Sequence, residues 1–73
     1  MARLYPLDAD LAASIRRRRR SLGWSQNELA LAAGLTEAAL QRYETMRLPV
    51  APEKRAAIER VLAEEERKLR VPA

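Results

Sequence analysis

Apolar residues recur at helical spacing in four segments of the chain, with polar residues between them. In residues 8–23 the apolar positions lie four and seven residues apart, which places them on one face of a helix. These positions are Leu11, Ile15 and Leu22. Asp8 or Asp10 can cap this helix, and Gly23 can end it because glycine tolerates a left-handed conformation.

The next two segments carry their own helix boundaries. Ser25 and Glu28 have the spacing of a capping box, which predicts a helix that begins at residue 26. Gly34 can end that helix, and Thr36 can cap a third one that runs to about residue 46. The predicted inward positions of the two helices are Leu29, Ala30, Ala33, Leu40 and Tyr43, with Ala39 beside them.

A turn with Pro49 precedes the last helix, which Pro52 can open and which should run to about residue 70. Its apolar stripe is Ile58, Val61, Leu62 and Leu69. The acidic run 64–66 is interpreted as a solvated face. The pattern predicts an all-α fold of four helices, or five if the last one breaks near Ala63. Residues 1–10 are taken as a lead-in and 11–73 as a single compact domain.

Composition narrows the possible chemistry. The 73 residues include no cysteine and no histidine, which excludes disulfides, Cys/His zinc sites and catalysis by a thiol or imidazole. No glycine-rich phosphate loop is present, so we expect neither an enzyme nor a cofactor. No apolar run reaches membrane-spanning length, and we expect a cytoplasmic protein without a membrane or small-molecule partner. The net charge of +4 favours an anionic partner, most often nucleic acid.

One spacing in residues 25–46 is specific. Ala30, Gly34 and Leu40 lie at i, i+4 and i+10. A small residue lets two helices cross closely, glycine permits the sharp turn between them, and leucine anchors the second helix in the core. The spacing predicts a helix-turn-helix at about residues 25–46.

The segment "GWSQNELALAAGLTEAALQRYE" resembles the XRE-type domains of the phage lambda repressor/Cro superfamily. The matching residues are Gly23, Ser25, Gln26, Leu29, Ala30, Gly34, Leu35, Leu40 and Glu44, with an arginine four residues before Gly23. The resemblance covers residues 11 to about 62. It implies a transcriptional regulator that binds double-stranded DNA as a homodimer, with helix 36–46 in the major groove of a palindromic operator. We expect a small phage-type or mobile-element repressor.

The outward face of helix 36–46 carries the candidate base-reading residues: Glu37, Ala38, Gln41 and Arg42. Gln41 can pair with adenine, Arg42 with guanine or a phosphate, and Glu37 with the amino group of cytosine. A solvated helix face is the alternative interpretation of the same residues. The candidate phosphate contacts are Ser25, Gln26, Thr36, Thr45, Arg47, Arg16 and Arg20.

The five consecutive arginines, 16–20, point in different directions because successive helical residues turn by about 100°. The resemblance pairs Arg19 with Glu44 as a structural ion pair. Arg18 is expected to run its stem along the core and extend its charge outward. The other three are assigned to solvent or phosphates. Trp24 and Tyr43 are interpreted as core residues rather than base-stacking groups.

The loop after helix 36–46 departs from the family pattern. Met46 stands where a glycine is common, and Pro49 comes early, so we expect a different loop conformation.

Two further expectations concern partners. The possible dimer contacts are Val61, Leu62 and Leu69. For Leu62 the domain's own core is the alternative. The acidic Glu37 supports a second possible function, a protein-interaction module or an inhibitor of a nucleic-acid enzyme.

Overall fold

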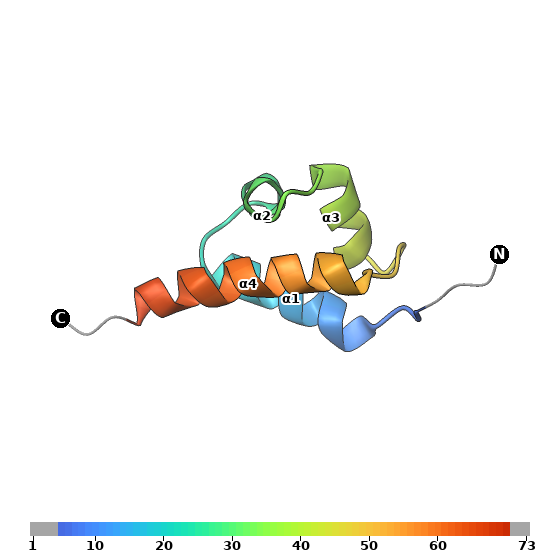
Figure 1. Ribbon diagram of the computed structural model, residues 1–73, viewed down its shortest axis with the longest axis horizontal. Coiled ribbons are helices and arrows are strands. Elements are labelled where there is room, and N and C mark those ends of the chain that lie inside the picture. Colours follow the sequence, from blue (N-terminus) through green and yellow to red (C-terminus); the bar gives the residue numbers. More distant parts are fainter. Residues whose placement is uncertain (1–4, 71–73) are drawn as a thin grey trace.

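The computed structural model describes residues 5–70, and these residues form four helices and no strand (Figure 1). They are α1 (Ala9–Ser21), α2 (Gln26–Ala33), α3 (Glu37–Glu44) and α4 (Pro52–Leu69). The all-α prediction is confirmed, and α4 is a single continuous helix without a break near Ala63. Helices α1 and α4 lie side by side. Helices α2 and α3 lie together on one side of this pair and contact each other (Figure 1).

Local sequence explains where the helices begin and end. Asp8 accepts a hydrogen bond from the backbone N–H of Leu11 at 3.0 Å and so caps α1, which begins at residue 9, within the predicted lead-in. Ser25 and Glu28 form the predicted capping box of α2, in which each side chain accepts from the other residue's backbone N–H. Gly34 ends α2 with φ 74°, a conformation that costs glycine no steric energy.

The core lies where the four helices meet. It consists of Ile15, Leu29, Ala30, Leu40, Tyr43, Ile58 and Leu62. Leu62 is fully buried within the chain, so its side chain cannot serve as a dimer contact. Val61 is half-buried and packs against the same core, and only Leu69 of the three predicted contacts is largely exposed. The reason is the position of each residue along α4, because the other helices bury its apolar stripe as far as Leu62 and leave Leu69 largely uncovered.

The end of α3 differs from the prediction, and the following loop contains a left-handed residue. The helix stops at Glu44, two residues earlier than expected, and Met46 adopts φ 65°. This is the left-handed region that glycine favours, so a methionine occupies a glycine-type conformation here. The expectation that the loop differs from the family pattern stays a prediction. Among the helices of residues 5–70, none is both long and apolar enough to cross a bilayer.

Candidate nucleic-acid interface

A buried ion pair joins α1 to the C-terminal end of α3. The Nε and Nη2 atoms of Arg19 donate to the two carboxylate oxygens of Glu44 at 2.8 and 3.0 Å, so the predicted pair is present. The Glu44 side chain is 1% exposed and that of Arg19 is 9% exposed. Arg19 also donates to the backbone oxygen of Trp24 at 2.8 Å, which holds the turn between α1 and α2. The Glu44 carboxylate raises the pKa of Arg19, so the guanidinium stays charged.

The side chain of Gln26 joins this ion pair, a contact that the sequence did not indicate. Its Nε2 atom donates to Oε1 of Glu44 at 3.1 Å. The amide group has two N–H bonds, and one of them remains for another acceptor. The network therefore links α1, the start of α2 and the end of α3, and it holds the first residue of α2 in a fixed orientation.

The predicted base-reading face of α3 is exposed. Glu37, Ala38, Gln41 and Arg42 are all open to solvent, while Leu40 on the opposite side of the helix is fully buried. Within residues 5–70, the side chains of Gln41 and Arg42 make no hydrogen bond to another residue. Two polar groups with directional donors therefore stand free on a helix that is anchored from behind.

The predicted phosphate contacts differ in whether their side chains have a free hydrogen-bond donor. Ser25 and Thr36 use their hydroxyl oxygens as acceptors at the starts of α2 and α3, so each hydroxyl proton remains available. Thr45 instead donates its hydroxyl proton to the backbone oxygen of Gln41 at 2.8 Å, so it has no free proton to give a phosphate in this conformation. Arg47 is exposed in the loop after α3.

Three of the five consecutive arginines share one surface. Arg16, Arg17 and Arg20 are exposed and line a shallow depression with the small residues Ala13 and Ser21. These positions follow the i, i+3, i+4 and i+7 spacing of one helical face. The five arginines therefore point in three directions: Arg18 and Arg19 each have a separate direction, and the other three share one exposed face.

Arg18 lies on the opposite side of α1 from Arg16, Arg17 and Arg20, and it acts as a clamp by binding two glutamates of α4. Its guanidinium donates to Glu59 at 2.6 and 3.1 Å and to Glu66 at two distances of 2.8 Å. The pairs lower the pKa of both carboxyl groups and raise that of Arg18. The interpretation of the acidic run as only a solvated face was wrong for Glu66. The sequence did contain an indication of this role, because Glu59 and Glu66 lie seven residues apart and therefore on one side of α4.

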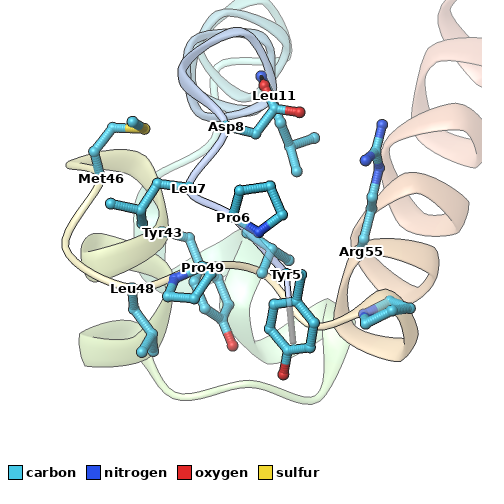
Figure 2. Close-up of a pocket in the computed structure, with 12 residues that line it drawn as sticks. Tyr5, Pro6, Leu7, Asp8, Leu11, Tyr43, Met46, Leu48, Pro49 and Arg55 are labelled. Carbon is cyan, nitrogen blue, oxygen red and sulfur yellow. Dashed lines mark hydrogen bonds between the residues drawn. The ribbon is translucent and has the colours of Figure 1, made fainter. Parts of the chain in front are cut away.

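A pocket lined mainly by apolar side chains lies near the end of α3. It has a volume of about 240 Å³ and lies between the N-terminal segment, α3 and the loop before α4. Figure 2 shows Tyr5 and Pro6 on one side of it and Leu48 and Pro49 on the other. Burial raises the pKa of Tyr43, which lines this pocket and so stays a neutral hydroxyl at ordinary pH. The charged residues in its lining are Asp8 and Arg55, and neither belongs to α3.

The chain matches a known protein family. A family model described as helix-turn-helix matches residues 15–69, which is most of the chain and includes α2, α3 and the ion pair. No curated protein and no solved structure matches the chain. The chain therefore belongs to the XRE-type helix-turn-helix family of DNA-binding regulators.

Proposed function

We propose that this protein is a sequence-specific transcriptional regulator that inserts α3 into the major groove of a palindromic operator. It acts as a homodimer and a small repressor of the phage or mobile-element type, in the cytoplasm of a prokaryotic or phage-infected cell. The observation that carries the proposal is the exposed face of α3, with Gln41 and Arg42 free and the helix fixed from behind by Leu40 and the Arg19–Glu44 pair.

The chemistry of the four exposed residues fits the major groove. Arg42 can donate two parallel hydrogen bonds to guanine, and Gln41 can donate to and accept from adenine. Ala38 lets the helix backbone approach the bases and can contact a thymine methyl group. Glu37 can accept from the amino group of cytosine, and its charge disfavours phosphates nearby. Each correct bidentate pair discriminates against a wrong base by about 1–3 kcal/mol.

Phosphate contacts would flank this face. The Glu44 network leaves one N–H of Gln26 free at the start of α2, where the backbone N–H groups also favour an anion. Ser25, Thr36 and Arg47 can add donors from the starts of α2 and α3 and from the loop. Arg16 and Arg20 are exposed on α1, and their positive charges would attract the negatively charged duplex.

DNA binding is tested with fluorescently labelled duplexes from the region upstream of the protein's own gene. Arg42→Ala and Gln41→Ala should each weaken binding by about 1–3 kcal/mol and relax specificity at one base pair. Arg60→Ala is the matched control, because Arg60 is an exposed arginine on α4, outside the proposed interface. Equal binding of scrambled DNA, or equal losses for Arg42→Ala and Arg60→Ala, would contradict sequence reading by α3.

Glu37 favours a second function, in which the same face binds a protein instead of DNA. A carboxylate at the first position of the reading helix repels phosphates, and such a face could bind a partner or inhibit a nucleic-acid enzyme. Salt dependence separates the two functions. DNA binding through several phosphates weakens steeply as salt is added, by a power of the salt concentration close to the number of contacts. A flat salt response with weak affinity would favour the protein-interaction role.

A further inference from the structure

The apolar face of α4 extends beyond the part that the other three helices cover. Ile58 and Leu62 are buried, but Leu69, on the same helical face, is 70% exposed. Figure 1 shows why, since the red C-terminal turns of α4 extend along the long axis of the molecule past α1 and α2. The last turns of the helix therefore present a leucine that the rest of the described chain leaves largely uncovered.

A depression lies beside this leucine, where α4 passes the end of α1. It has a volume of about 400 Å³ and is lined by Ser21, Leu22, Glu66, Leu69 and Arg70. Leu22 is half-buried and packs against the core, so the apolar part of the depression is continuous with the interior. An apolar side chain that enters here would contact both leucines, with a carboxylate and a guanidinium at the edge.

The charges on the same turns make the helix end complementary to itself. Residues 64–66 are three glutamates, and residues 67, 68 and 70 are basic. Two copies of this segment in antiparallel orientation would place the acidic turn of each copy against the basic turn of the other. A two-fold interface requires such self-complementarity because the same surface is used twice.

The ion pairs of Glu64 and Glu65 do not oppose that arrangement, whereas Glu66 stays paired with Arg18 of its own chain. Arg67 lies 3.8 Å from Glu64, and Lys68 lies 2.9 Å from Glu65, both within the one helix. Exposed pairs of this kind contribute little to stability, so their charges can turn to a second copy at small cost.

We infer that the C-terminal turns of α4 pair with a second copy of this chain in an antiparallel two-fold interface. Leu69 of each copy lies in the depression beside Leu22 of the other, and Arg70 of each copy faces Glu64 and Glu65 of the other. The inference rests on the proposed function, because a two-fold pair presents two α3 helices to a palindromic operator. Val61, Leu62 and Leu69 were the dimer contacts expected from the sequence, and only Leu69 takes part in this interface.

Sedimentation of the full chain without DNA tests this interface. The wild-type mass should rise with concentration from 8.3 kDa toward twice that value. Leu69→Asp should raise the dimer dissociation constant about tenfold or more, because it places a charge at the centre of the contact. Leu31→Asp is the matched control, since Leu31 is also 70% exposed but lies on α2. A wild-type chain that stays monomeric at millimolar concentration, or equal dissociation of both variants, would overturn the inference.

Charge reversal tests the orientation. Glu65→Lys and Arg70→Glu should each weaken the dimer, and the double variant should recover at least half of the loss in log affinity. A double variant as weak as the two changes combined would overturn the antiparallel pairing. Circular dichroism reports whether each variant stays helical. The masses are measured without DNA, and base reading is measured on a single half-site, so failure of the dimer and failure of DNA recognition are separate results.

Discussion

Removal of Arg19 should strongly destabilise the fold, whereas removal of its neighbour Arg18 should destabilise it only mildly. Arg19→Met leaves the Glu44 carboxylate, 1% exposed, with only the hydrogen bond from Gln26. Loss of one partner of a buried pair costs about 3–5 kcal/mol. A chain of 73 residues has a total stability of about 4–11 kcal/mol at the usual 0.05–0.15 kcal/mol per residue, so the loss would be from about a quarter to all of it.

Arg18→Met is the internal control for this comparison. It removes the same kind of side chain one residue earlier, but the carboxylates of Glu59 and Glu66 are 60% and 30% exposed and can return to water. Pairs of this kind contribute about 1 kcal/mol or less. Urea unfolding followed by circular dichroism measures both variants against the wild type. Complete unfolding of Arg19→Met without urea counts as the upper end of the expected loss, provided that Arg18→Met stays folded.

A double-mutant cycle tests whether the cost comes from the unpaired charge. When Glu44→Leu is added to Arg19→Met, the buried carboxylate is gone and an apolar contact can replace it. The double variant should therefore be more stable than Arg19→Met alone. The reasoning is refuted if Arg19→Met costs no more than Arg18→Met, or if the effects of Arg19→Met and Glu44→Leu simply add.

Two further predictions concern the backbone and acid. Met46→Gly should be about 1 kcal/mol more stable than Met46→Ala, because both lose the side chain but only glycine relieves the φ of 65°; thermal unfolding of the two variants would show equal stability if the backbone were unstrained. The pairs with Arg18 hold the pKa values of Glu59 and Glu66 below 4.5, so their contribution is complete above that pH and is lost as the pH falls through the lowered values. The stability difference between wild type and Arg18→Met should accordingly shrink in acid, and a difference independent of pH would contradict the clamp.

Apolar spacing and capping residues were sufficient to predict the four helices. Helix capping depends on residues only three positions apart. Ser25 and Glu28 therefore predicted the start of α2, and Thr36 predicted the start of α3. The end of α3 was predicted two residues too late, because no glycine marks the stop. Met46 carries the left-handed conformation without the residue type that signals it.

The candidate site was predicted in part. Helical periodicity placed Gln41 and Arg42 on the exposed face of α3, and neither side chain makes a hydrogen bond or ion pair within residues 5–70. The bond between Gln26 and Glu44 could not be predicted, because it depends on how α2 and α3 approach each other. The same holds for Thr45, whose hydroxyl proton is donated to its own helix.

The sequence by itself determined the elements of this protein, their inward faces and its family, since these follow from spacing within single helices and one turn. The tertiary structure decided which charges meet and which leucines remain exposed. Arg18 and Arg19 are adjacent and identical in chemistry, yet one clamps α4 and the other is buried against α3. Leu62 and Leu69 share one stripe, yet only the first is buried. Both differences depend on where neighbouring helices end, which periodicity along one helix does not encode.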